Sequence, residues 1–309
     1  MKAIRIHAFG GPSVLKLEEV DRPTFGEEEL LVKVIAASVN PVDYKIREGK
    51  YPVVKADKLP YILGRDLAGI VEECGGLVDD WKRGDEVFAV PGIDRGAYAE
   101  YAVVKTSEAA RKPRNLDFVA AAAVPLAGLT AWEGLFRYGG LQAGQRVLIH
   151  GGAGGVGHFA IQFAKAHGAY VITTVSERHV PFVRALGADE VIDYTKQRFE
   201  DVVKDVDLVY DLIAGETQER SWNVLRRGGT LVSTLTEPSQ DTARAKGVRA
   251  LRYTVSDNGG ELEEIGRLIA AGKVKPKVTK TFPLAEAASA QQYLQAGHIE
   301  GKVVLTVAA

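Results

Sequence analysis

The chain has little sulfur and no bias of charge. Of its 309 residues only Cys74 is a cysteine, which excludes disulfide bonds within the chain and any zinc site built from several cysteines. The 39 basic and 40 acidic residues nearly cancel, and no basic stripe suggests binding to nucleic acid or to an anionic membrane. No apolar run reaches the roughly 18 to 20 residues that cross a bilayer, and "MKAIRIHAFG" lacks a signal-peptide core. We therefore expect a soluble, cytoplasmic protein with neither nucleic acid nor membrane as a partner.

The order of apolar segments predicts two domains. Up to about residue 120, short stretches such as "LLVKVIAASV" and "YAEYAVV" alternate with Gly, Pro and Asp turns, which favours a barrel-like or sandwich-like β unit. From Arg146 onward, strands alternate with amphipathic helical segments, which favours a mostly parallel, doubly wound α/β sheet. After about residue 258 two helices and two strands follow that do not obviously extend this sheet. We predict a discontinuous β-rich domain of residues 1–122 and 259–309 around an α/β domain of residues 123–258.

Two local patterns predict particular elements. The alternating N-terminus "MKAIRIHAFG" is typical of an edge strand. The segment "FVAAAAVPLAGLTAWEGLF" has helical periodicity with interruptions at Pro125 and Gly128, and Thr130 stands at a helix start.

A glycine cluster lies between a buried strand and a helix in "VLIHGGAGGVGHFAIQFAKAHG". Gly152, Gly154 and Gly157 fit G-x-G-x-x-G, in which the first glycine permits a tight turn, the second lets a pyrophosphate approach, and the third allows close helix packing. The flanking strand and helix, the closing Gly168 and a second strand stand at the required spacing. The pattern predicts a dinucleotide site at loop residues Gly152, Ala153, Gly154, Gly155, Val156 and Gly157.

The end of the second strand favours NADP(H) over NAD(H). NAD enzymes place an acid there to bind the ribose 2′-OH, whereas this chain reads "VITTVSERHV". Ser176 and Arg178 offer the hydroxyl and guanidinium that suit a 2′-phosphate. Glu177 leaves an alternative open, because a carboxylate turned inward would serve the 2′-OH instead.

Motifs across roughly 280 residues resemble the medium-chain dehydrogenase/reductase superfamily. They include "AASVNPVDYKIREGKYP", "LGRDLAGIVEECG", "AAVPLAGLTAWEGL", "VLIHGGAGGVG" and "GHIEGKVVLTV". More narrowly they are similar to its zinc-free quinone oxidoreductase (zeta-crystallin-like) branch. The resemblance implies a GroES-like β-rich catalytic domain plus a Rossmann domain with a doubly wound parallel sheet. It also implies a homodimer formed through the edge of the nucleotide-domain sheet, at "VRALRYTV".

The positions that hold the catalytic metal in zinc alcohol dehydrogenases of this superfamily carry other residues here. The matching positions are Asn40, Arg65 and, less securely aligned, Leu126. Asparagine is a poor zinc ligand, arginine cannot bind zinc because its guanidinium is a cation, and leucine has no atom that could bind a metal. We therefore expect no metal, and reduction of an acceptor that is already electron-poor.

The resemblance places further residues at the site. Asn40, Tyr44 and Tyr51 are the catalytic candidates, as a carbonyl-binding amide and two phenol donors. Each has a plain alternative: a turn residue before Pro41 for Asn40, and ordinary packing for the tyrosines. Arg65 and Asp66 are expected to form a local charge pair.

The other coenzyme candidates come from the Rossmann half and the C-terminal segment. The resemblance implies contacts with the adenosine 2′-phosphate for Tyr194 and with the nicotinamide for Thr130. Ile213 and Leu235 follow two later strands, and loops at the C-terminal ends of such strands bound the ligand crevice, so we expect both to contact the nicotinamide ribose or ring. Lys302 is a lesser candidate, with a solvated lysine as the alternative. For Thr130 an N-cap role is equally open, and His150 is interpreted as structural.

The leading hypothesis is an NADPH-dependent, zinc-independent oxidoreductase that passes hydride to a quinone or to an α,β-unsaturated carbonyl compound. A non-catalytic NADPH-binding sensor or interaction protein, and a zinc-type alcohol dehydrogenase, stay as alternatives. The sequence does not separate quinones from enones.

Overall fold

The computed structural model describes residues 1–297 and 299–307, which form two compact units. The β-rich unit comprises Met1–Leu126, Asp257–Gly272 and the residues from Pro276 onward. The α/β unit comprises Ala127–Ser256 and Lys273–Lys275. Each unit has its own hydrophobic core.

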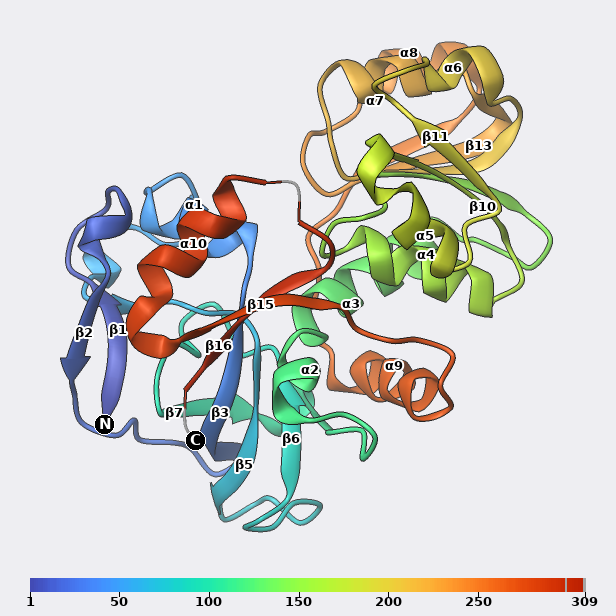
Figure 1. Ribbon diagram of the computed structural model, residues 1–309. Coiled ribbons are helices and arrows are strands. Elements are labelled where there is room, and N and C mark those ends of the chain that lie inside the picture. Colours follow the sequence, from blue (N-terminus) through green and yellow to red (C-terminus); the bar gives the residue numbers. More distant parts are fainter. Residues whose placement is uncertain (298, 308–309) are drawn as a thin grey trace. The chain divides into compact units, whose positions relative to one another are not determined.

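The α/β unit is built on a six-stranded parallel sheet (Figure 1). Its order is β11-β10-β9-β12-β13-β14, so the chain runs outward from β9 and then starts again on the other side of it. Helices α4 and α5 lie on one side of these strands and α6, α7 and α8 on the other. This is the doubly wound order that binds dinucleotides at the carboxyl ends of the strands. The elements are β9 (Arg146–His150), α4 (Gly157–Ala166), β10 (Tyr170–Val175), α5 (Val180–Ala185), β11 (Glu190–Asp193), α6 (Phe199–Val202), β12 (Val206–Asp211), α7 (Glu216–Ser221), β13 (Leu225–Ser233), α8 (Gln240–Lys246) and β14 (Arg249–Arg252).

The first strand–helix–strand segment follows directly from its residue pattern. Strand β9 is buried from Val147 to His150, as expected for a central strand covered on both faces. Helix α4 ends at Ala166, and Gly168 adopts a left-handed conformation (φ +82°) that favours glycine just after a helix. The chain then returns into β10, parallel to β9.

The β-rich unit combines a three-stranded and a seven-stranded sheet. The C-terminal strand β16 pairs with β3 from near the start of the chain, so both ends contribute to one sheet (Figure 1). The strands are β1 (Lys2–Ile6), β2 (Lys16–Glu19), β3 (Glu29–Val39), β4 (Tyr61–Ile62), β5 (Leu67–Cys74), β6 (Glu86–Ala89), β7 (Tyr101–Lys105), β8 (Ala109–Arg111), β15 (Val278–Pro283) and β16 (Lys302–Thr306). The helices are α1 (Pro41–Arg47), α2 (Phe118–Ala122), α9 (Gly259–Ala270) and α10 (Ala287–Gln295).

Three local predictions are wrong in detail. Strand β1 is the middle strand of its sheet, because the two-residue strand β4 pairs with its second edge. The predicted interruption at Pro125 is confirmed, because α2 ends at Ala122 and Pro125 begins α3 (Pro125–Trp132), where a proline loses no hydrogen bond. The predicted interruption at Gly128 is wrong, because Gly128 lies inside α3. Thr130 likewise lies inside α3, so the alternative of an N-cap role is excluded.

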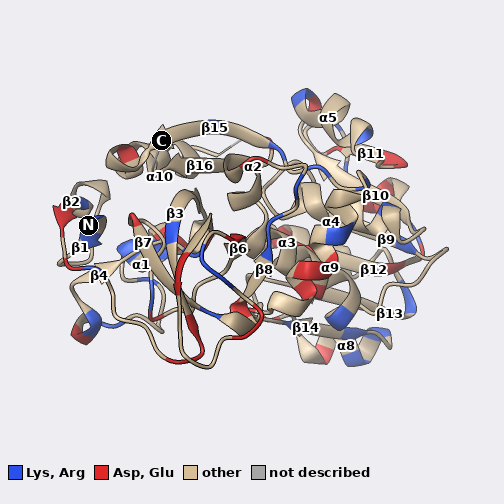
Figure 2. Cartoon of the chain, turned by 90° about the horizontal axis from the view of Figure 1, so that it is seen from below, with Lys and Arg blue, Asp and Glu red and all other residues tan. Residues whose placement is uncertain are grey.

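Basic and acidic residues are interspersed in the view of Figure 2 rather than gathered into one stripe. Across the described residues, none of the helices combines the length and the apolar character that crossing a bilayer requires.

Candidate functional site

The glycine loop between β9 and α4 is tightly packed at two positions and open at a third. A Cβ on Gly152 would overlap Thr173 Oγ1, and a Cβ on Gly157 would overlap the carbonyl oxygen of Gly151. The nearest atom to a Cβ on Gly154 is that same oxygen, at 3.5 Å, an ordinary contact distance. The left-handed turn is made by Gly151 (φ +74°), one residue before the predicted motif, so the turn role assigned to Gly152 belongs to Gly151. The loop thus presents open backbone beside the first turn of α4, which suits an anionic group.

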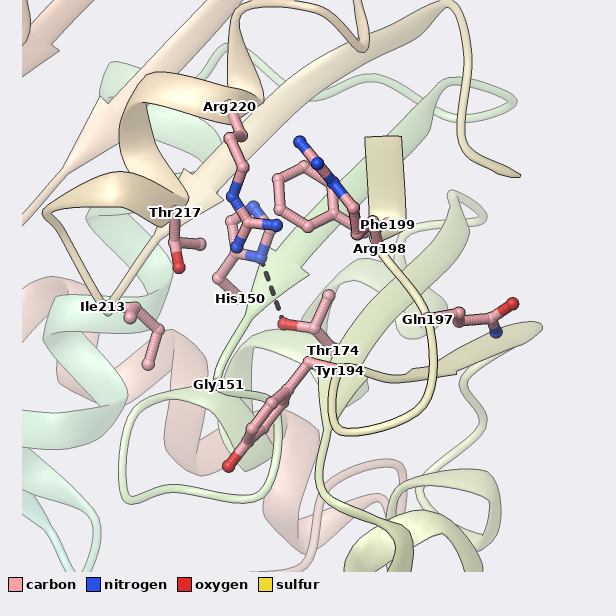
Figure 3. Close-up of a pocket in the computed structure, with 10 residues that line it drawn as sticks. All are labelled: His150, Gly151, Thr174, Tyr194, Gln197, Arg198, Phe199, Ile213, Thr217 and Arg220. Carbon is pink, nitrogen blue, oxygen red and sulfur yellow. Dashed lines mark hydrogen bonds between the residues drawn. The ribbon is translucent and has the colours of Figure 1, made fainter. Parts of the chain in front are cut away.

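A pocket of about 310 Å³ adjoins this loop at the carboxyl ends of the strands (Figure 3). Its size falls at the lower end of the range for small-molecule sites. The lining residues lie at the carboxyl ends of β9 and β10, follow β9, β11 and β12, or belong to α6 and α7: His150, Gly151, Thr174, Tyr194, Gln197, Arg198, Phe199, Ile213, Thr217 and Arg220.

His150 is buried beside this pocket and is neutral near pH 7. Burial lowers the pKa of His150 to about 4. Ser221 Oγ donates to the carbonyl of Thr217, so it accepts a hydrogen bond from His150 Nε2 at 2.9 Å. His150 Nδ1 is then the acceptor for Thr174 Oγ1 at 3.0 Å. These bonds fix the ring, in agreement with the structural role expected for His150.

Two arginines that the sequence analysis did not single out line the same pocket. Arg198 and Arg220 both pair with the carboxylate of Glu200, at 2.6 and 3.2 Å. Although burial acts to raise it, hydrogen bonds and these two cations lower the pKa of Glu200. The guanidinium of Arg220 also lies over the ring of Phe199, 5.0 Å from its centroid. The sequence signal that could have identified them is their position in the segments that follow β11 and β12, two strands that end at the ligand-binding edge.

Two of the predicted coenzyme residues line this pocket, and two others lie on the turn that follows β10. Tyr194 and Ile213 line the pocket, with 54% and 52% of their surfaces exposed. Ser176 is half-buried and Arg178 is exposed on the turn after β10. Arg178 Nε donates to His179 Nε2 at 3.1 Å.

The other predicted residues of the α/β unit are separate from the pocket lining. Leu235 follows β13 and is 40% exposed. Thr130 is half-buried in α3, and its backbone carbonyl accepts hydrogen bonds from Tyr210 Oη (2.9 Å) and Tyr253 Oη. Their contacts with the nicotinamide stay predictions.

A second cluster of polar side chains is buried in the β-rich unit. Asp66 is fully buried and accepts hydrogen bonds from Ser38 Oγ, from Asn40 Nδ2 at 2.6 Å, and from the backbone nitrogen of Leu126 at 2.5 Å. Lys302 Nζ donates to Asn40 Oδ1 and lies 3.4 Å from Asp66 Oδ2. Asn40 is itself buried with both ends of its amide bonded, so its predicted role as a direct substrate ligand finds no support.

Two charge predictions are corrected by this cluster. Arg65 does not pair with Asp66; its guanidinium contacts Asp257 at 2.6 Å instead. Lys302 is 3% exposed, so the solvated alternative is wrong, and its ammonium is engaged within the β-rich unit rather than free to hold a coenzyme.

The zinc positions of related alcohol dehydrogenases do not fit zinc here. Zinc needs nitrogen, sulfur or oxygen donors without a competing cation. The amide oxygen of Asn40 already binds an ammonium, and Arg65 is itself a cation. Within residues 1–297 and 299–307, no three His, Cys, Asp or Glu side chains are grouped to hold a metal ion.

Helix α1 carries a buried acid and a candidate proton donor side by side. Asp43 Oδ2 accepts hydrogen bonds from the Asn40 backbone at 2.7 Å and from Tyr98 Oη at 2.9 Å. Burial raises the pKa of Asp43 to about 7. Tyr44 is half-buried, which raises its pKa and keeps the phenol protonated. Tyr51 is also half-buried, packed against the core of the β-rich unit.

The fold and the glycine loop define a two-domain dehydrogenase or reductase, and comparisons with known proteins agree. Residues 26–114 match the alcohol dehydrogenase GroES-like domain, and residues 186–305 match the zinc-binding dehydrogenase family. The chain is 40% identical to an NADPH-dependent alkenal/one oxidoreductase of Arabidopsis thaliana, over 99% of this chain and 79% of that protein.

Solved structures narrow the class further. The quinone oxidoreductase of Coxiella burnetii superposes with a TM-score of 0.93 at 39% identity, covering 100% of this chain and 99% of that one. The Escherichia coli quinone oxidoreductase complexed with NADPH superposes with a TM-score of 0.90 at 31% identity, covering 99% and 100%. The chain belongs to the medium-chain dehydrogenase/reductase superfamily, in its zinc-free quinone oxidoreductase branch.

Proposed function

We propose that this chain is an NADPH-dependent, zinc-independent oxidoreductase that reduces quinones or α,β-unsaturated carbonyl compounds. When bound, NADPH supplies a hydride from C4 of its nicotinamide ring. The acceptor gains that hydride and one proton, so NADPH and a proton are consumed and NADP⁺ and a two-electron-reduced product leave. The names of the relatives, an alkenal/one oxidoreductase and quinone oxidoreductases, support this proposal.

The observation that carries the proposal is the contrast within the glycine loop. Gly152 and Gly157 have no room for a Cβ, whereas Gly154 has open space beside it. A turn that served packing alone would have no reason to keep the middle glycine bare. Gly152 and Gly154 already donate their backbone N–H groups to the carbonyls of Thr174 and Gly151. The pyrophosphate would therefore take the remaining N–H groups of the loop and of the first turn of α4.

The pocket beyond the loop suits the adenosine half of the coenzyme. In this assignment Tyr194, Ile213 and Phe199 would hold the purine, and Ser176 and Arg178 would hold the 2′-phosphate of the adenosine ribose. Ile213 shares the pocket with Tyr194, so we place it at the adenosine end rather than at the nicotinamide end, where its position after a strand led us to expect it.

On the substrate side, Tyr44 and Tyr51 are the proposed hydrogen-bond donors. The raised pKa of Tyr44 keeps its phenol protonated, so that it can donate to the oxygen on which charge develops during reduction. Asn40 and Lys302 are proposed to support this region indirectly, through the buried cluster with Asp66.

Steady-state oxidation of NADPH tests the proposal. Turnover is expected with naphthoquinone, phenanthrenequinone or simple enones, and it should be unchanged by a zinc chelator. Dependence on added zinc would favour the alcohol dehydrogenase alternative. Tight NADPH binding without turnover of any acceptor would favour the non-catalytic sensor.

We further propose a homodimer in the cytoplasm, formed through β14. This strand is at the edge of the six-stranded sheet, and Ala250 and Leu251 are its apolar positions. Native mass spectrometry tests the assembly, and a monomer at micromolar concentration would contradict it.

A further inference from the structure

Glu177 is an acidic residue at the position where the 2′-phosphate of NADPH would need positively charged partners. Strand β10 ends at Val175, and Glu177 follows it on the adjoining turn. Enzymes that use NAD place an acid near this point to bind the ribose 2′-OH. A carboxylate at the same place repels a phosphate that carries between one and two negative charges. The chain therefore needs a way to make Glu177 compatible with NADPH.

The neighbouring strand supplies the counter-charge. Val175 at the end of β10 lies opposite Asp193 at the end of β11, so the segments that follow both strands start side by side. Lys196 is three residues beyond β11, and its Nζ lies 2.5 Å from Glu177 Oε1 and 3.8 Å from Asp193 Oδ2. The hydrogen bond with Glu177 raises the pKa of Lys196, so the lysine is charged at any physiological pH.

The turn that carries Lys196 is anchored to the sheet and continues into the pocket. The backbone nitrogens of Lys196 and Gln197 both donate to the carbonyl of Asp193, at 3.1 Å. The Asp193 carboxylate in turn accepts hydrogen bonds from Thr195. Tyr194 and Gln197, on either side of this turn, line the pocket. Lys196 thus projects from a fixed turn at the rim of the proposed adenosine site.

Charge counting assigns the lysine a role. Glu177 and Asp193 are balanced by Arg178 and Lys196, and without Lys196 two acids would face one arginine. The ion pair contributes little to folding, because both side chains are more than half exposed, Glu177 at 69% and Lys196 at 59%. The effect of Lys196 on a phosphate placed beside it is larger, because the hydrogen bond between them would be charge-assisted.

We propose that Lys196 is a coenzyme-specificity residue, which neutralises Glu177 and offers the 2′-phosphate a second cation beside Arg178. The inference rests on the proposed NADPH-dependent function and adds a residue that the sequence analysis did not single out. In this proposal the Glu177 carboxylate orients Lys196 rather than binding a ribose hydroxyl.

Calorimetric titration with adenosine 2′,5′-bisphosphate and adenosine 5′-diphosphate tests the role without any turnover. Lys196→Met should weaken the 2′,5′-bisphosphate by about tenfold and change the 5′-diphosphate by less than about twofold. Glu177→Gln alone should strengthen the 2′,5′-bisphosphate, and Glu177→Gln combined with Lys196→Met should recover most of the affinity that Lys196→Met loses. Raising the salt concentration should shrink these differences, because the charges are exposed.

Lys165→Met is the matched control. Lys165 on α4 pairs with Asp189 at 2.8 Å. Asp189 precedes the first residue of β11, so this pair lies at the amino ends of the strands, away from the pocket at their carboxyl ends. Lys165→Met should leave both affinities unchanged. The proposal is overturned if Lys196→Met binds the 2′,5′-bisphosphate as the wild type does, or if Glu177→Gln restores nothing. A wild-type protein without preference for the 2′,5′-bisphosphate would instead contradict the NADPH assignment itself.

Discussion

Lys302 Nζ lies 3.4 Å from Asp66 Oδ2, and both side chains are buried in the β-rich unit. Asn40 bridges the two, accepting a hydrogen bond from the lysine and donating one to the aspartate. Where zinc-dependent members of the superfamily bring a metal cation, this chain thus has an internal ammonium. The pair ties β16 to β3 and to the segment before β5, which makes it a structural element as well as an electrostatic one.

Removing the lysine should destabilise the protein strongly. Lys302→Met leaves Asp66 buried without its counter-ion, and breaking a buried ion pair from one side costs about 3–5 kcal/mol. We expect a lower urea midpoint, followed by circular dichroism. Lys302→Met combined with Asp66→Asn should be more stable than Lys302→Met alone, because the orphaned charge is gone.

The ion pair between Arg226 and Asp207 provides the comparison, with a distance of 2.5 Å and an arginine side chain that is 45% exposed. Arg226→Met should cost less than about 1 kcal/mol. If Lys302→Met were as mild as Arg226→Met, the buried ammonium would not have the importance that we assign to it.

Asp43 should make the protein less stable as the pH rises. Its pKa is raised from 3.8 to about 7 by burial, with the charge of Asp66 acting in the same direction and Lys302 opposing it. The folded state therefore binds a proton that the unfolded state releases between about pH 4 and 7. The stabilisation is complete below pH 3.8 and is lost as the pH rises through 7, by up to about 4 kcal/mol.

Asp43→Asn checks this assignment. The amide keeps an oxygen for the bonds from Asn40 and Tyr98 but has no proton to lose. Denaturation between pH 5 and 8 should show a flatter pH dependence in this variant than in the wild type. Parallel profiles for the two proteins would place the titration elsewhere.

Much of the α/β unit could be predicted because its signals are local. The glycine loop, its strand and its helix lie within about twenty consecutive residues, and each position has a direct steric reason. Even so, the left-handed turn falls at Gly151 rather than Gly152. Two adjacent glycines are equivalent in a sequence pattern, and only the packing of Gly152 against Thr173 separates them.

The buried cluster could not be predicted for the opposite reason. Lys302 and Asp66 are 236 residues apart in the chain, so no periodicity or spacing connects them. The wrong pairing of Arg65 with Asp66 came from their adjacency. Arg65 and Asp66 lie at a bend just before β5, where Arg65 reaches Asp257 while Asp66 enters the core.

Arg178→Ala should separate the two coenzymes. If the exposed guanidinium after β10 binds the 2′-phosphate, its loss should weaken NADPH by about 1.5–3 kcal/mol and leave NADH unchanged. Fluorescence titration of both coenzymes measures this directly. An equal loss for both would mean that Arg178 acts through the fold of the turn, for example through its bond to His179.

Substitutions in the glycine loop should separate an effect on coenzyme affinity from an effect on protein stability. In Gly154→Ala the new methyl group meets only the Gly151 carbonyl at 3.5 Å, so the protein should fold as the wild type does. The same methyl group occupies the space reserved for the pyrophosphate, so NADPH affinity should fall by about tenfold or more.

Gly157→Ala should instead lower the melting temperature, because its methyl group overlaps the Gly151 carbonyl and the Gly152 backbone. Gly76→Ala, which meets nothing within 4 Å, serves as the neutral control. An unaltered NADPH affinity in Gly154→Ala would mean that the open face of the loop binds nothing, and the coenzyme would have to be sought away from α4.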